Sequence, residues 1–334
     1  MRKVPRFGSI AIAAVAVVVL AAACSSKASP GNDGTQLSGQ VIVSGSSTVQ
    51  PISSLVAEQF SGENPGVSIK VDGPGTGDGF ALFCKGETDI SDASRPIKDE
   101  EKAACQQAGI SYAELKVGLD GITVMTNPAN GAVTCLSKAD LYSLVGPEST
   151  GFDKWSDANT LDKQLGGKNN FPNVPLVITA PGEESGTYDA FVELALKNIA
   201  EERGKDDTST RPDYQSSGND NVIIQGIEGS PTSFGWVGFA YAEQNASGVK
   251  ILQVDGGDGC VTPNRETIAD GSYPLSRALY IYVNTTKAKA NPALKAYVDY
   301  FVQNLKQVVA DAGYVDLPQD QITATQQAWQ SAAV

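Results

Sequence analysis

The feature that most restricts the fold of this chain is a local pattern that recurs along it. Short runs rich in β-branched residues lead into small polar turns, and helical segments follow these turns. Alternating short strands and helices predict an α/β protein. Because the N–H groups at a helix N-terminus attract anions, the same pattern also predicts anion-binding turns.

The first of these segments begins with an extended run at residues 40–44. Apolar residues recur at helical spacing just after Pro51, at Ile52, Leu55, Val56 and Phe60. The turn between them carries the hydroxyls of Ser47 and Thr48 at the expected helix N-terminus. These hydroxyls either bind an anion or only cap the helix.

The second and third segments carry different chemistry. A glycine-rich turn at residues 73–79 follows a predicted strand at residues 67–71, and its glycines allow the backbone to approach a ligand closely. Its spacing fits neither a dinucleotide fingerprint nor a P-loop. The third segment, residues 89–97, has a hydroxyl at Ser94 beside the guanidinium of Arg95, whose planar fork suits an oxyanion.

The fourth segment has a predicted strand at residues 176–180, followed by a turn that contains Ser185, Gly186 and Thr187. A helix with one apolar face is predicted next, through Tyr188, Phe191, Val192, Ala195 and Ile199. Each turn alone would be an ordinary feature of an α/β protein. Their repetition favours a protein that binds an anion.

Charge and composition exclude several classes of function. The 334 residues carry a formal charge of −13, which disfavours a nucleic acid as partner. The chain has no histidine, so the imidazole-dependent routes of serine, cysteine and most metal hydrolases are closed. Catalysis by carboxylates alone stays open, but the spacing of the 38 Asp and Glu residues singles out no pair.

The N-terminus resembles a bacterial lipoprotein signal. Basic residues precede an apolar run at residues 10–20, and three alanines lead to Cys24. We expect residues 1–23 to be removed and Cys24 to be acylated, which anchors the exported protein at the outer face of the cell membrane. The alternative is an uncleaved anchor helix, for which the apolar run is short. Residues 24–38 are predicted to form a flexible tether.

The remaining cysteines fit an exported protein. Cys84, Cys105, Cys135 and Cys260 are even in number and allow three pairings. We expect Cys84 to bond to Cys105 across a short segment and Cys135 to bond to Cys260. A zinc site is the competing interpretation, but the chain has neither a Cys-x-x-Cys pair nor a histidine.

Several segments, in order along the chain, resemble the phosphate-binding subunits of bacterial ABC transporters, of the PstS/SphX type. They are residues 46–51, 75–77, 94–97, 185–187, 211–214, 219–222, 234–241 and 273–277. The resemblance implies a two-lobed periplasmic-binding-protein fold of type II, with a mixed sheet in each lobe. It places residues 39–119 and 256–334 in one lobe and residues 120–255 in the other. The two crossings are expected near residues 119–123 and 250–259.

The resemblance also implies site residues. Ser47, Thr48, Thr76 and Ser94 match phosphate contacts of the first lobe, and Val49 contributes its backbone N–H. Ser185, Gly186 and Thr187 match contacts of the second lobe. Some relatives have an arginine where this chain has Pro181, so Arg95 is the candidate cation. Those relatives have an aspartate in place of Ser94, which leaves Asp78, Asp92 and Asp220 as candidate acceptors of the phosphate proton.

The function that these observations imply is capture of inorganic phosphate and delivery to the permease subunits of an ABC transporter. No catalysis, cofactor or metal is expected. One alternative is a receptor for sulfate, molybdate or a phosphonate on the same fold. Others are a phosphatase of the cell envelope and a secreted phosphate scavenger that serves no transporter.

Overall fold

The structure is a computed structural model, and it describes residues 37–183 and 185–332. The predicted signal segment, Cys24 and nearly all of the predicted tether lie outside the described residues. Among the described residues, no helix is long and apolar enough to cross a bilayer.

The strands of the described residues form two sheets. Their bounds are β1 (Gly39–Gly45), β2 (Val67–Asp72), β3 (Ile90–Ala93), β4 (Tyr112–Thr126), β5 (Cys135–Ser137), β6 (Val177–Ala180), β7 (Gln215–Ser216), β8 (Ser233–Gly238), β9 (Lys250–Ile251), β10 (Gln253–Asp255), β11 (Cys260–Val261) and β12 (Ser276–Asn284). The main sheet has the order β2, β1, β3, β12, β4, β8, β6, β7, with β9 also paired to β4. A small second sheet joins β11, β10 and β5.

The long strand β4 belongs to both halves of the main sheet. It pairs antiparallel with β12 from Tyr112 to Gly121, and then antiparallel with β8 from Ile122 to Thr126. We call β2, β1, β3 and β12 the β1 half of the sheet, and β8, β6 and β7 the β8 half. Within the β1 half, β1 is parallel to both β2 and β3, whereas β12 runs antiparallel to β3.

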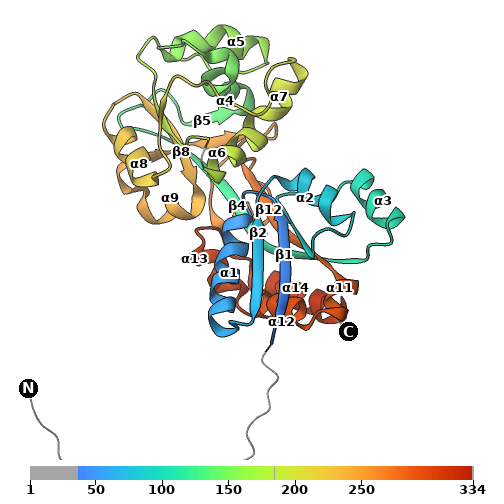
Figure 1. The fold of residues 1–334 in the computed structure, drawn as a ribbon. Coiled ribbons are helices and arrows are strands. Elements are labelled where there is room, and N and C mark those ends of the chain that lie inside the picture. Colours follow the sequence, from blue (N-terminus) through green and yellow to red (C-terminus); the bar gives the residue numbers. More distant parts are fainter. Residues whose placement is uncertain (1–36, 184, 333–334) are drawn as a thin grey trace, which may run out of the picture. The chain divides into compact units, whose positions relative to one another are not determined.

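Helices cover both halves of the main sheet, as Figure 1 shows. Around the β1 half lie α1 (Gln50–Glu63), α2 (Thr76–Phe83), α3 (Asp99–Gln107), α11 (Thr285–Ala290), α12 (Pro292–Gln303), α13 (Leu305–Asp311) and α14 (Gln319–Ala332). Around the β8 half lie α4 (Lys138–Val145), α5 (Asn159–Gln164), α6 (Gly186–Phe191), α7 (Lys197–Glu202), α8 (Asp220–Glu228) and α9 (Phe239–Asn245). Helix α10 (Arg265–Ala269) lies in the segment between β11 and β12. The predicted α/β class is confirmed.

Four short helical turns complete the described part of the chain. Three are 3-10 turns, η1 (Pro147–Ser149), η2 (Trp155–Ala158) and η4 (Ala246–Gly248), and the fourth, η3 (Val192–Leu196), is a π-helix. The π-turn η3 joins α6 directly to α7. Unlike 3-10 turns, π-helical turns are rare, and they are frequent at functional sites.

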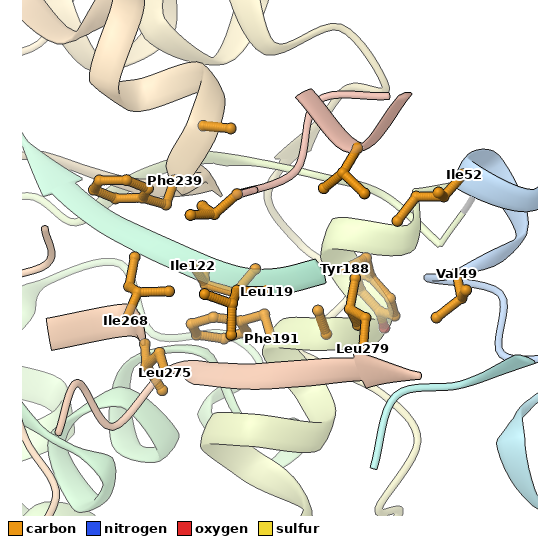
Figure 2. Packing of buried hydrophobic residues seen from close by; sticks show 14 of the residues in the cluster. Val49, Ile52, Leu119, Ile122, Tyr188, Phe191, Phe239, Ile268, Leu275 and Leu279 are labelled. Carbon is orange, nitrogen blue, oxygen red and sulfur yellow. The ribbon is translucent and has the colours of Figure 1, made fainter. Parts of the chain in front are cut away.

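The core positions the turns that follow the strands. Val49 and Ile52 at the start of α1 belong to the same buried cluster as Tyr188 and Phe191 of α6, and Figure 2 shows their side chains. The ring of Phe191 stacks on that of Trp236 in β8, with centroids 4.0 Å apart. Because these apolar faces are buried, the N-termini of α1 and α6 are held at the edge of the sheet.

Both predicted disulfides are confirmed. Cys84 bonds to Cys105, which ties the end of α2 to α3. Cys135 of β5 bonds to Cys260 of β11, which joins residues 125 positions apart in the small sheet.

Candidate functional site

Three turns that follow parallel strands meet at one edge of the β1 half. The β1–α1 turn is held to β3 by a hydrogen bond from the Ser46 N–H to the Asp92 carbonyl oxygen (2.9 Å). The turn after β2 is held to β1 by a bond from the Gly75 N–H to the Gly45 carbonyl oxygen (2.8 Å). This edge lies outside the carboxyl ends of the strands, where α/β proteins bind their ligands.

Glycines allow these turns to approach one another closely. A β-carbon at Gly79 would lie 2.4 Å from the Cα of Gly45. A β-carbon at Gly45, whose φ is +150°, would lie 2.1 Å from the Asp92 carbonyl oxygen. No larger residue fits at either position without moving the backbone, so the glycines fix how α2 packs against β1.

The predicted hydroxyl contacts of the β1 half converge on one pocket of about 670 Å³. Ser47 and Thr48 reach it from the β1–α1 turn, Thr76 from the start of α2, and Ser94 from the end of β3. The hydroxyls of Thr76 and Ser94 lie 3.1 Å apart, and the Ser94 N–H donates to the Thr76 hydroxyl (3.2 Å). Four hydroxyl-bearing residues from three turns therefore line a common space.

The backbone of Val49 is placed differently from the expectation. Its N–H donates to the Ser46 carbonyl oxygen (3.1 Å), and its side chain is buried in the core. This amide closes the turn before α1, so the structure does not present it to the pocket as an unused donor.

Arg95 lines the pocket, but a carboxylate already holds its guanidinium. Nη1 and Nη2 donate to the two oxygens of Glu101 at 2.8 and 2.7 Å. The guanidinium also lies 5.6 Å from the ring centroid of Phe80. The bond to Glu101 raises the pKa of Arg95, which stays charged, but this neighbour balances much of its charge.

The fourth predicted turn lies beside the first. The Ser185 hydroxyl caps α6 by accepting from the Thr187 N–H (3.2 Å). A β-carbon at Gly186 would lie 3.8 Å from the Ser47 carbonyl oxygen. Ser185, Gly186 and Thr187 do not line the pocket themselves. The next turns of the same helix line it, through Asp189, Val192 and Glu193.

The three candidate proton acceptors are separated by the fold. Asp78, in the first turn of α2, lines the pocket. Asp92 is fully buried, accepts a hydrogen bond from the Ser53 hydroxyl (3.0 Å) and does not line the pocket. Burial raises the pKa of Asp92 to about 7. Asp220 lies at the start of α8, outside the pocket lining, and burial raises its pKa as well.

The structure adds an arginine that the sequence did not single out. Arg277 of β12 has a side chain only 7% exposed, and its Nη2 donates to the Thr48 hydroxyl (2.8 Å). Its Nε lies 3.3 Å from Asp120 of β4, and its Nη1 donates to Glu193. Burial raises the pKa of Asp120, although Arg277 opposes this shift. The available signal was that Arg277 belongs to residues 273–277, one of the segments that resemble phosphate-binding subunits.

Two acidic side chains of the α6–η3 helix were also not predicted from the sequence as residues of the site. Asp189 accepts a hydrogen bond from the Ser47 hydroxyl (2.9 Å), and Glu193 accepts from Arg277. Both contacts join this helix to groups of the β1 half. No cluster of three or more metal-ligating side chains occurs within residues 37–183 and 185–332.

Comparisons with known proteins agree with this architecture. The family model of the PBP superfamily domain matches residues 30–304. The protein SphX of Synechocystis sp. is 39% identical over 287 residues, which is 86% of this chain and 81% of that protein. The phosphate-binding protein PstS of Staphylococcus saprophyticus is 34% identical, over 98% of this chain and 94% of that protein.

Solved structures are similar as well. A crystal structure described as a possible phosphate binding protein from Planctomyces limnophilus is 35% identical and has a TM-score of 0.81, over 89% of this chain and 100% of that one. An ABC-type phosphate transport receptor from Vibrio cholerae, 23% identical with a TM-score of 0.59, shares the fold. The predicted type II periplasmic-binding-protein fold is thus confirmed. The chain therefore belongs to the PBP superfamily and, within it, to the family of the SphX and PstS proteins.

Proposed function

We propose that this protein captures inorganic phosphate in the pocket described above and delivers it to the permease subunits of an ABC transporter. The observation that carries the proposal is the convergence of four hydroxyls, those of Ser47, Thr48, Thr76 and Ser94, on one space. The names of the relatives, phosphate-binding protein and phosphate transport receptor, support the same ligand. Ser185, Gly186 and Thr187 do not line this pocket, and closure of the two lobes would bring them to the anion from the β8 half.

The proposed chemistry is binding without reaction. Hydroxyls and helix N-termini act at close range, where they outweigh distant charges that the solvent screens. A formal charge of −13 is therefore compatible with anion capture. No cofactor or metal takes part, and no bond of the phosphate is broken.

We infer two lobes, with residues 39–119 and 256–334 in one and residues 120–255 in the other. The change of partner along β4, from β12 at Gly121 to β8 at Ile122, supports the first crossing. The pocket lining supports a site between the lobes, since it combines residues 46–98 with residues 189–208. Closure of two lobes around the anion would supply donors from both sides.

The proposed location is the outer face of the cell membrane. Cleavage before Cys24 and acylation of this cysteine would leave a lipid anchor, and residues 24–38 would separate the anchor from the folded body. Mass spectrometry of the protein purified from a membrane fraction tests this. An acylated peptide that begins at Cys24 is expected, and an intact N-terminal segment would contradict it.

Calorimetric titration of residues 25–334 with phosphate and then with sulfate tests the ligand. We expect phosphate to bind tightly and sulfate weakly. Thr76→Val, which removes one pocket hydroxyl at nearly constant volume, is expected to weaken phosphate binding by roughly 10-fold. The matched control is Thr323→Val on α14, whose hydroxyl donates to the Gln319 carbonyl oxygen and which does not line the pocket.

The outcomes separate the alternatives. Tight sulfate binding with weak phosphate binding would assign the site to another oxyanion. Equal effects of the two threonine substitutions on phosphate affinity would mean that the pocket is not the binding site.

A further inference from the structure

The cationic side chains near the pocket differ in their carboxylate partners and in their exposure to solvent. Arg95 is held by both oxygens of Glu101 within its own segment. Lys98 and Lys197 have side chains that are 56% and 42% exposed, so solvent screens their charges. Arg277 is the buried one, with a side chain 7% exposed. A buried guanidinium acts on an anion with much less screening.

The two carboxylate partners of Arg277 lie on different elements, one on the neighbouring strand and one on a separate helix. Asp120 lies directly across from Arg277 in the antiparallel pairing of β4 with β12, and its side chain is 8% exposed. The sheet therefore fixes Asp120 as a permanent counterion. Glu193 lies on the separate helix α6–η3, and its side chain is 41% exposed. This partner can leave Arg277 without disturbing the sheet.

Thr48 links Arg277 to the proposed phosphate site. Its hydroxyl accepts a hydrogen bond from Nη2 of Arg277 (2.8 Å). A hydroxyl that accepts a bond still has its own proton to donate, and a charged donor polarises it. Arg277 and Thr48 together therefore offer a guanidinium and an O–H group to one oxyanion.

We propose that Arg277 is the cation of the anion site and that Glu193 is an internal competitor, whose carboxylate occupies Arg277 until an oxyanion displaces it. This inference rests on the proposed function.

The balance of charges around Arg277 supports displacement of the Glu193 carboxylate by an oxyanion. With both Asp120 and Glu193 in contact, two negative charges surround one positive charge. An anion that entered beside them would meet net repulsion, whereas an anion that replaces Glu193 takes over its bonds. The π-turn η3 carries Glu193, and π-turns of this kind shift a side chain relative to an unbroken α-helix.

Glu193 also ties the two halves of the sheet together. Its contact with Arg277 lies one helical turn from the bond between Ser47 and Asp189, so both join α6–η3 to the β1 half. Release of Glu193 would leave the second bond in place. Anion binding is thereby coupled to the loss of one of these two contacts between α6–η3 and the β1 half.

Calorimetry of residues 25–334 with inorganic phosphate tests the proposal. Arg277→Gln is expected to weaken binding by roughly 10- to 100-fold, and Arg277→Lys by less, because a lysine keeps the charge but not the fork. Glu193→Gln is expected to tighten binding by roughly 3- to 10-fold, since the competing charge is gone. The controls are Arg265→Gln and Glu243→Gln, which alter an exposed arginine–carboxylate pair outside the pocket lining.

Each result supports or overturns the proposal. Arg277→Gln leaves Asp120 buried without its cation and can impair folding, so a thermal melt accompanies each titration. The Glu193 side chain is far more exposed, so Glu193→Gln is expected to fold and tests the proposal even if Arg277→Gln does not fold. Unchanged or weaker phosphate binding by a folded Glu193→Gln variant would refute the role of Glu193. Wild-type affinity in a folded Arg277→Gln variant would refute that of Arg277.

Failure of the proposed function has a different signature. If the wild-type protein binds sulfate but not phosphate, the same variants are titrated with sulfate, and the expected order of affinities is unchanged. If the wild type binds neither anion, the proposed function and this inference both fall. If the wild type binds phosphate and all variants match it, only this inference falls.

Discussion

Replacement of Asp92 by asparagine should change how the stability of the protein depends on pH. Asp92 is fully buried in β3, and its carboxyl accepts one hydrogen bond, from the Ser53 hydroxyl. Burial raises its pKa from an ordinary 3.8 to about 7. Asparagine has nearly the same shape, keeps an oxygen for Ser53 and carries no charge.

The direction in which stability changes with pH follows from the pKa values of Asp92 in the unfolded chain and in the folded protein. Between about pH 4 and pH 7 the unfolded chain releases the Asp92 proton, whereas the folded protein keeps it. The contribution of the neutral carboxyl to stability is therefore complete below pH 4 and is lost as the pH rises to 7. One pKa unit corresponds to about 1.36 kcal/mol, so the total loss is at most ~4 kcal/mol.

Urea denaturation at several pH values, from 4 to 8, measures the effect. At pH 8 Asp92→Asn is expected to be more stable than the wild type by ~2–4 kcal/mol, and at pH 4 the two should agree within ~1 kcal/mol. Asp99→Asn is the surface control, because the Asp99 side chain is 98% exposed. A difference for Asp92→Asn that is the same at pH 4 and pH 8 would refute the reasoning.

Two further predictions concern stability. Gly79→Ala should destabilise the protein by ~1–3 kcal/mol, because the new methyl group would meet the backbone of β1. Gly77→Ala in the same helix places its methyl group in open space and should be neutral or slightly stabilising. Equal shifts of the thermal melting temperature for the two variants would contradict this prediction. Replacement of Cys135 and Cys260 by alanine should cost ~5 kcal/mol of loop-closure entropy, against ~3 kcal/mol for the other disulfide, because the loops span 125 and 21 residues. Denaturant titration ranks the two double variants, and the reverse ranking would count against the loop-length account.

The local elements could be predicted because their signals are local. The extended run at residues 40–44 and the helical spacing from Ile52 to Phe60 correspond to β1 and α1. The turns that follow the strands could be identified for the same reason, since glycine and small hydroxyl residues fix the backbone within a few positions. The resemblance to known proteins then grouped these turns into one site.

The contacts of Arg277 could not be predicted in this way. Arg277 and Thr48 are 229 positions apart, and their hydrogen bond exists only because β12 lies between β3 and β4. The direction of the Asp92 side chain was also hidden. All four residues of β3 are buried, so polar and apolar residues do not alternate along it, and the sequence did not show which face Asp92 would take.

The position of β12 in the sheet also affects the order in which the protein can be assembled. Strand β12 pairs with β3 on one side and β4 on the other, yet it is the last strand along the chain. Until residues 276–284 are available, β3 and β4 have no partner between them, and the early strands stay separate from the β8 half. Such long-range pairing is slow, because the loop-closure entropy must be overcome first. The arginine that we assign to the anion site therefore arrives with the strand that completes the sheet, so a partly synthesised chain lacks both at once.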